Sequence, residues 1–190
     1  MRLFIALPVP ADVRENIILH TAQLRGKFPG LKWVGQDALH LTLSFLGETD
    51  PSKLETIRAA MNSTASQIES YDMELVGMGA FPRKGPPRVL FIPVKKGLEE
   101  TRRLNSILVR ELGDLSPKEK RKFTPHLTIA RVKNTVQTPD PDSEGQDLAF
   151  TFSADRLILY RSHLTPDGAR YEELEEARFG RAHVGRSREK

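Results

Sequence analysis

The sequence predicts an α+β fold of two similar lobes, each a mainly antiparallel sheet with helices on its outer face, around a central cleft. Two observations lead to this prediction. Short apolar stretches typical of strands are interrupted by three longer stretches in which apolar residues recur at helical spacing. In addition, His-Leu-Thr-Leu at 40–43 recurs as His-Leu-Thr-Ile at 126–129, about half the chain later, and such a repeat indicates a duplicated unit.

The first half is expected to contain four strands and two helices. Pro29-Gly30 ends the first helix, and Asp50-Pro51 begins the second, with Asp50 as the N-cap. We expect strands over 2–7, 31–34, 39–46 and 72–78, and helices over 11–28 and 51–70.

The second half repeats this mixture after a loop rich in Pro, Gly and basic residues. We expect strands over 89–94, 124–132, 148–154, 157–164 and 169–179, a helix over 98–112, loops over 80–87, 116–122 and 134–147, and a turn at 165–168. Residues 1–180 are expected to form one bilobal domain. Residues 181–190 lack apolar periodicity and are expected to form a flexible basic tail.

Composition limits the classes of function. The chain has 190 residues and no cysteine, which excludes disulfides, thiolate catalysis and cysteine metal sites. No apolar run is long enough to span a membrane, and the short run near the N-terminus does not resemble a signal peptide. We therefore expect a cytoplasmic protein with no membrane contact, and a monomer.

The positive charge is local. The formal net charge is +4, but residues 178–190 alone hold five basic residues and one acidic residue. Residues 83–133 hold fourteen basic and five acidic residues. This stretch contains the Lys118–Lys122 connection and the second motif, so we expect it to steer an anionic partner such as RNA.

The repeated motif places His and Thr on one face of a strand, because residues i and i+2 of a strand share a face. His40 and Thr42 then point one way, and Leu41 points into the core. His126 and Thr128 do the same in the second copy. If the two faces meet, two imidazoles and two hydroxyls surround one space.

This set of side chains suits hydrolysis of a phosphodiester. One histidine can act as base and the other as acid near neutral pH, and the threonine hydroxyls can donate to phosphate oxygens. A single His-x-Thr on a strand is more often a packing feature, but two copies at this offset favour function. Neither motif strand adds a His, Asp or Glu that would complete a zinc site, so no metal and no cofactor are expected.

Several segments together resemble the 2H phosphoesterase superfamily, and within it the RNA 2′,3′-cyclic phosphodiesterases, or 2′-5′ RNA ligase-like proteins. They are the opening Arg-Leu-Phe-Ile-Ala-Leu at 2–7, Lys-Trp-Val at 32–34, His-Leu-Thr-Leu-Ser-Phe-Leu-Gly at 40–47, Phe-Thr-Pro-His-Leu-Thr-Ile-Ala-Arg at 123–131, and Tyr-Arg-Ser-His-Leu-Thr-Pro-Asp-Gly at 160–168. The resemblance covers nearly the whole chain.

The resemblance implies hydrolysis of a ribose 2′,3′-cyclic phosphate to a 2′-phosphomonoester. By this analogy His40 is the general acid that protonates O3′, His126 is the general base that activates water, and Thr42 and Thr128 hold phosphate oxygens.

The resemblance also implies that Arg131 contacts the phosphate. It is the fifth residue after His126, so strict strand alternation would turn it to the other face unless the strand contains a bulge. Phe45 stands at the same place in the first motif. It is either a core residue or the floor of a base pocket.

Alternatives to this enzyme remain. The chain could bind RNA ends without turnover, or hydrolyse small nucleotide cyclic phosphates. Because ligation uses an RNA 5′-hydroxyl where hydrolysis uses water, the same site could also join RNA ends by a reversible 2′-5′ ligation. The expected partner is RNA with a 2′,3′-cyclic phosphate end, or related nucleotides.

Overall fold

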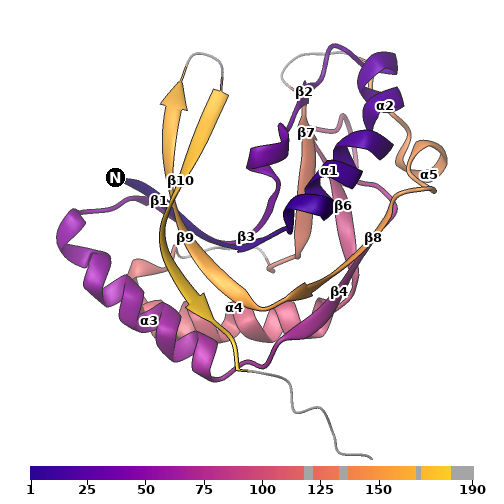
Figure 1. The fold of residues 1–190 in the computed structure, drawn as a ribbon. Coiled ribbons are helices and arrows are strands. Elements are labelled where there is room, and N and C mark those ends of the chain that lie inside the picture. Colours follow the sequence, from indigo (N-terminus) through magenta and orange to yellow (C-terminus); the bar gives the residue numbers. More distant parts are fainter. Residues whose placement is uncertain (118–121, 133–136, 166–167, 181–190) are drawn as a thin grey trace, which may run out of the picture.

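A computed structural model describes residues 1–117, 122–132, 137–165 and 168–180. The α+β class is confirmed, with two antiparallel sheets that curl around a common core (Figure 1). The first sheet has four strands in the order β10-β9-β1-β3. Their bounds are Arg2–Pro8 for β1, His40–Glu48 for β3, Arg156–Thr165 for β9 and Gly168–Arg178 for β10.

The second sheet has the order β2-β7-β6-β4-β8, and β5 pairs with β6 beside this path. Its bounds are Lys32–Trp33 for β2, Tyr71–Val76 for β4, Gly79–Phe81 for β5, Val89–Lys96 for β6, His126–Arg131 for β7 and Ala149–Ala154 for β8. Each motif therefore opens a strand, one in each sheet.

The helices lie on two sides of the sheets, as Figure 1 shows. Their bounds are Ala11–His20 for α1, Ala22–Lys27 for α2, Leu54–Ser66 for α3, Leu98–Leu112 for α4 and Pro141–Glu144 for α5. Short 3-10 turns span Gln36–Ala38, Pro51–Lys53 and Gly113–Leu115 (η1, η2 and η3). The helix expected over 98–112 is confirmed at both ends.

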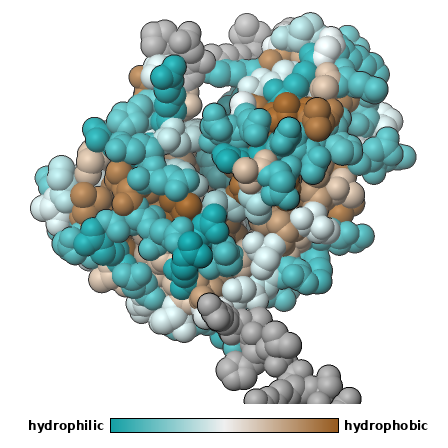
Figure 2. Space-filling model, viewed as in Figure 1, coloured by the Kyte–Doolittle hydropathy of each residue, from teal (hydrophilic) through white to brown (hydrophobic). Residues whose placement is uncertain are grey.

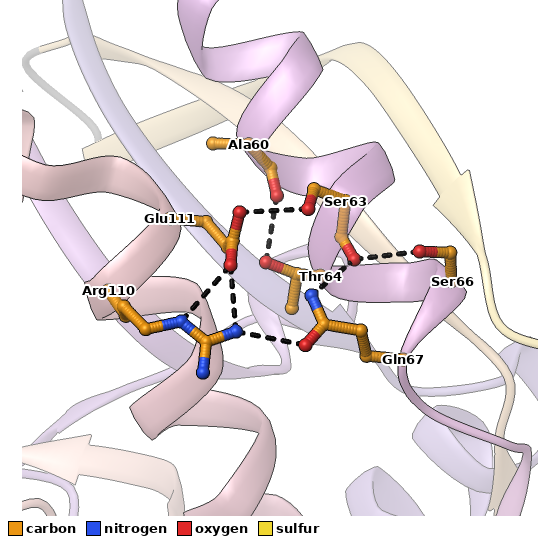
Figure 3. Close-up of polar contacts among 7 residues, drawn as sticks. All are labelled: Ala60, Ser63, Thr64, Ser66, Gln67, Arg110 and Glu111. Carbon is orange, nitrogen blue, oxygen red and sulfur yellow. Dashed lines mark hydrogen bonds and ion pairs between the residues drawn. The ribbon is translucent and has the colours of Figure 1, made fainter.

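A polar contact joins α3 to α4 (Figure 3). The Ser63 hydroxyl donates to Glu111 at 2.8 Å, and the Arg110 guanidinium donates to both Glu111 and Gln67. Apolar residues of both helices, including Ile57, Met61 and Leu104, are buried beneath this contact. The pair thus forms one layer behind the first sheet.

The prediction of one helix over 11–28 is wrong, because the helix is interrupted at Thr21. The Thr21 hydroxyl is fully buried and donates to the Ile17 carbonyl at 2.7 Å. A threonine side chain that bonds the backbone of the preceding turn competes with regular helical bonding. The chain restarts as α2 and ends before Pro29, as expected.

Three further expectations need correction. The helix expected over 51–70 begins with a 3-10 turn and ends at Ser66, although Asp50 caps it as predicted by accepting from the Ser52 amide at 2.8 Å. The loop expected over 80–87 starts as β5, because its first residues pair with β6. The loop expected over 134–147 contains α5, capped by Asp140.

One apolar core contains residues of both sheets and of the helices behind them. A second, smaller cluster of Phe4, Ala6, Ile158, Tyr160 and Tyr171 lies on the other face of the first sheet. Within the described residues, no helix is both long enough and apolar enough to cross a membrane. The Lys118–Arg121 part of the basic connection, the centre of the turn at 165–168 and the tail at 181–190 lie outside the described residues.

Candidate functional site

The two motif strands lie against each other across the two sheets. On β3, His40 and Thr42 are half-buried, and Leu41 between them is buried. On β7, His126 and Thr128 are half-buried on either side of buried Leu127. We call the surface formed by His40, Thr42, His126 and Thr128 the motif face. The alternation expected from the sequence is therefore confirmed in both strands.

Both motif strands contain a β-bulge at the same place. In β3, Thr42 lies opposite Ala6 but Ser44 lies opposite Ile5, so Leu43 is the extra residue. In β7, Thr128 lies opposite Phe91 but Ala130 lies opposite Leu90, which makes the residue between them extra. In each strand the bulge falls one residue after the motif threonine.

The bulge returns the fifth residue after each histidine to the motif face. Two consecutive buried residues follow each threonine, Leu43-Ser44 in one strand and Ile129-Ala130 in the other. The next residue, Phe45 or Arg131, is exposed. Because a bulge shifts the alternation by one residue, Arg131 faces the same side as His126. This is the irregularity that the sequence required for Arg131.

A single guanidinium influences both histidines. The positive charge of Arg131 lowers the pKa of His40 and the pKa of His126. Arg131 is therefore within Coulombic reach of both imidazoles, although they belong to different sheets. β3 and β7 contact each other, and the charge of Arg131 acts on the imidazole of each strand.

Burial is the main cause of the pKa shift of each histidine. It lowers the pKa of His40 to about 4, and the Ala38 carbonyl opposes this effect. Burial also lowers the pKa of His126, opposed by the Thr124 carbonyl. Both imidazoles are therefore mostly neutral at pH 7 in the free protein.

The tautomer of His126 follows from its hydrogen bond. Its Nδ1 lies 2.8 Å from the carbonyl oxygen of Thr124, which can only accept. Nδ1 therefore carries the hydrogen and donates it. The other ring nitrogen, Nε2, is left as an acceptor in the neutral ring, which is what a general base requires.

Aromatic rings surround His40. Its ring centroid lies 4.8 Å from that of Phe4, 5.1 Å from Tyr171 and 5.8 Å from Tyr160. Tyr160 also donates a long hydrogen bond of 3.4 Å to Glu173. These rings desolvate the imidazole and lower its pKa.

Two other rings hold His126. Phe81 and Phe91 stack at 4.3 Å, and each lies edge-on to the imidazole at 5.2 Å. Gly79 lies directly opposite Phe91, and a Cβ there would come within 2.6 Å of the Phe91 ring. The absence of a side chain at Gly79 therefore makes room for the ring that packs on His126.

Sequence reasoning did not identify these aromatic neighbours. Phe4 is as buried as Leu3 and Ile5 on either side of it in β1, but it belongs to the smaller cluster on the other face of the sheet. Because all three residues are apolar, the sequence shows no alternation that distinguishes Phe4. The sequence did not decide whether Phe45 is a core residue or part of a base pocket. Its side chain is 52% exposed on the motif face, and its ring centroid lies 5.8 Å from that of Phe4.

The surface is hollowed beside these strands. Figure 2 shows the hollow between the β9–β10 hairpin and the part of the molecule that carries β2 and α2 in Figure 1. Among the described residues, no three His, Asp or Glu side chains gather where they could hold a metal ion.

Residues 11–166 match the sequence model of the 2′-5′ RNA ligase superfamily. The chain is 35% identical over 181 residues to an RNA 2′,3′-cyclic phosphodiesterase of Methanocaldococcus jannaschii, covering 93% of this chain and 99% of that protein. It is 34% identical to a protein of the same name from Thermotoga maritima, covering 94% of this chain and 96% of that one.

Solved structures share the fold. A crystal structure from Thermus thermophilus matches with a TM-score of 0.83 at 31% identity, covering 96% of this chain and all of that one. E. coli LigT complexed with 3′-AMP matches with a TM-score of 0.76 at 24% identity, covering 94% and 97% of the two chains. The curled two-sheet architecture is thus that of known proteins.

Proposed function

This chain belongs to the 2′-5′ RNA ligase superfamily, and we propose that it hydrolyses the 2′,3′-cyclic phosphate at the end of an RNA chain to a 2′-phosphomonoester, without a metal ion. The observation that carries the proposal is the motif face, where two histidines from different sheets share one arginine charge. The names of the relatives support the same reaction.

The reaction needs one proton acceptor and one proton donor. His126 Nε2 takes a proton from water as the water oxygen bonds to phosphorus. The bond between phosphorus and O3′ breaks, and His40 gives its proton to O3′. The phosphate stays on O2′, and the two histidines return to their starting states by exchanging protons with solvent.

His126 suits the role of base in this scheme. Its pKa is lowered by burial, so it is neutral at pH 7, and its Nδ1–H is fixed on the Thr124 carbonyl. The rings of Phe81 and Phe91 limit rotation of the imidazole. A base held in this way loses little conformational entropy when it is positioned against the water molecule.

His40 must gain a proton before it can act as acid. Its pKa of about 4 leaves it neutral in the free protein at pH 7. A phosphate anion bound beside the imidazole raises this pKa, because a negative charge favours the protonated ring. We therefore propose that substrate binding and proton uptake by His40 are coupled.

The remaining residues hold the substrate. Thr42 and Thr128 donate hydroxyl hydrogens to the nonbridging oxygens, and the Arg131 guanidinium balances their charge. Phe45 offers an exposed ring to the terminal base.

The matching bulges and the cross-strand proline opposite each histidine, Pro8 and Pro93, support a duplicated origin for the two sheets. We propose that residues 1–180 act as one bilobal unit with the site between the lobes, and that the unit works as a monomer.

The test is incubation with an oligoribonucleotide that ends in a 2′,3′-cyclic phosphate, with the product identified by phosphorus NMR. We expect a 2′-phosphomonoester and undiminished turnover in EDTA. A 3′-phosphate product, or loss in EDTA that zinc restores, would contradict the scheme.

The same experiment separates the alternatives. Stoichiometric binding without product would indicate an RNA-end binding module. Turnover of nucleoside cyclic phosphates alone would indicate a small nucleotide substrate. Addition of an RNA with a free 5′-hydroxyl tests for 2′-5′ ligation, which would yield a longer product that the enzyme cleaves again.

A further inference from the structure

Lys32 lies beside the proposed phosphate site and has no role in the scheme above. It is the first residue of β2, at the edge of the second sheet, and its partner in the register is Arg131. The next pair, Trp33 and buried Ala130, faces the core. Because directly opposed residues share a face, Lys32 points to the same side as Arg131, which is the side of the motif face.

Two positive charges directly opposite each other on neighbouring strands destabilise a sheet. Neither Lys32 nor Arg131 forms an ion pair with a described residue. Both are exposed. A like-charge pair without an acidic partner is an arrangement that an anion would relieve.

More positive charge gathers at the same end of the sheet. The connection from β5 to β6 carries Arg83, Lys84 and Arg88, and Arg88 accepts from the Val132 amide at 2.9 Å through its carbonyl. This connection therefore adjoins the end of β7. We call Lys32, Arg83, Lys84, Arg88 and Arg131 the basic edge.

Many arginines elsewhere on the surface form ion pairs. Arg58 pairs with Glu55 and Glu175, Arg110 with Glu111, and Arg156 with Asp155 and Glu176. No acidic residue occurs in the sequence from 75 to 98, nor from 16 to 36, where most of the basic edge arises. The charge of the basic edge is thus left available to a ligand.

We infer that the basic edge beyond Arg131 forms a second phosphate subsite, in which Lys32 binds the phosphodiester next to the cyclic phosphate on the same RNA chain. The inference rests on the proposed function for the identity of the terminal group. Figure 1 places β2 and β7 across the hollow from the β9–β10 hairpin. An RNA chain that leaves the motif face along β7 therefore passes Lys32. The enzyme then selects oligonucleotides over cyclic mononucleotides, which lack the second phosphate.

The test compares Lys32→Gln with Lys53→Gln, a control that removes from η2 an exposed lysine with no ion pair to a described residue. Binding of a short oligoribonucleotide with a 2′-phosphate end, and of a nucleoside 2′-phosphate, is measured over a range of salt concentrations. We expect Lys32→Gln to bind the oligonucleotide about fivefold more weakly, with a slope of log affinity against log salt smaller by about 0.7. Binding of the nucleoside 2′-phosphate stays unchanged.

Equal weakening for both ligands would overturn the inference, because Lys32 would then act at the terminal phosphate. No change for either ligand, or the same effect in Lys53→Gln, would overturn it as well. Hydrolysis of the cyclic end by the unmodified protein is followed in parallel. Its absence would count against the proposed function alone, since the binding comparison does not depend on turnover.

Discussion

The two halves of the molecule carry the same motif and the same bulge, yet they surround their histidines differently. His40 lies among Phe4, Tyr160 and Tyr171, with its pKa lowered to about 4. His126 lies against two phenylalanines and is tied to a backbone carbonyl. The same motif and bulge thus carry one histidine in each half, and burial among different side chains lowers the pKa of both.

The halves also differ at the position that each bulge returns to the motif face. One half presents a ring, Phe45, and the other presents a charge, Arg131. The single arginine acts on both imidazoles. In the proposed scheme, this difference gives an otherwise similar pair of strands one side for phosphate and one side for a base.

Removal of either histidine should have the largest effect. We expect His40→Ala and His126→Ala each to lower kcat by about 10²- to 10⁴-fold, the usual contribution of a positioned acid or base. His20→Ala, on the exposed face of α1, serves as the control and should keep full activity. Full turnover in either motif variant would show that the two halves do not act as a pair.

Arg131→Gln should follow in size, with a loss in kcat/KM of about 10- to 100-fold, as expected for a charged hydrogen bond to phosphate. Phe45→Gln is the matched change at the equivalent position and should cost much less. Equal losses in the two variants would contradict the division between a phosphate side and a base side.

The same pair of variants predicts a shift in pH dependence. Because the pKa values of His40 and His126 are both lowered, the maximum of kcat/KM should lie below pH 6.5. Loss of the Arg131 charge raises both pKa values, so the maximum of Arg131→Gln moves to higher pH. A maximum above about pH 7.5 in the unmodified protein would rule out these free-enzyme pKa values.

Gly79→Ala tests the support of His126 alone. The added Cβ collides with the Phe91 ring, which must shift away from the imidazole. We expect kcat to fall about tenfold, because small displacements of a catalytic group are costly. Gly35→Ala is the control, since a Cβ there meets no atom within 4 Å. A lower melting temperature with an unchanged kcat would show that Gly79 serves packing only.

Phe45→Ala should have the smallest effect. The ring is half-exposed, so its removal should leave the melting temperature nearly unchanged. We expect KM for an RNA substrate to rise about fivefold with kcat unchanged, as for loss of stacking on one base. A drop in melting temperature of several degrees would instead assign the ring to packing.

The sequence predicted the motif strands, the faces of their histidines and threonines, and the α4 helix. These features depend on local alternation and periodicity, which a single sequence contains. The sequence indicated that a bulge is needed for Arg131 to face the phosphate, but it did not show at which residue the bulge lies. In retrospect, the pairs Leu43-Ser44 and Ile129-Ala130 each put a small residue after an apolar one, where two neighbours share the core face.

Other features depend on contacts between distant segments. The role of Gly79 follows from its register with Phe91, and the pairing of Lys32 with Arg131 joins residues almost a hundred positions apart. The helix is interrupted at Thr21, although the apolar spacing continues through this position, and the buried Thr21 hydroxyl donates to the Ile17 carbonyl. Neither propensity nor periodicity contains this information.

The bulge has a consequence for how such a protein can change. It sets the number of residues between each histidine and the position that returns to the motif face, whatever residue stands there. An insertion or deletion of one residue in that interval would move the following core-facing side chains of the strand to the solvent face, and the solvent-facing ones to the core. A substitution at the last position leaves the core untouched. The number of residues in this interval is thus constrained, whereas the residue at its end can vary: the position carries a charged side chain in one strand and an aromatic ring in the other.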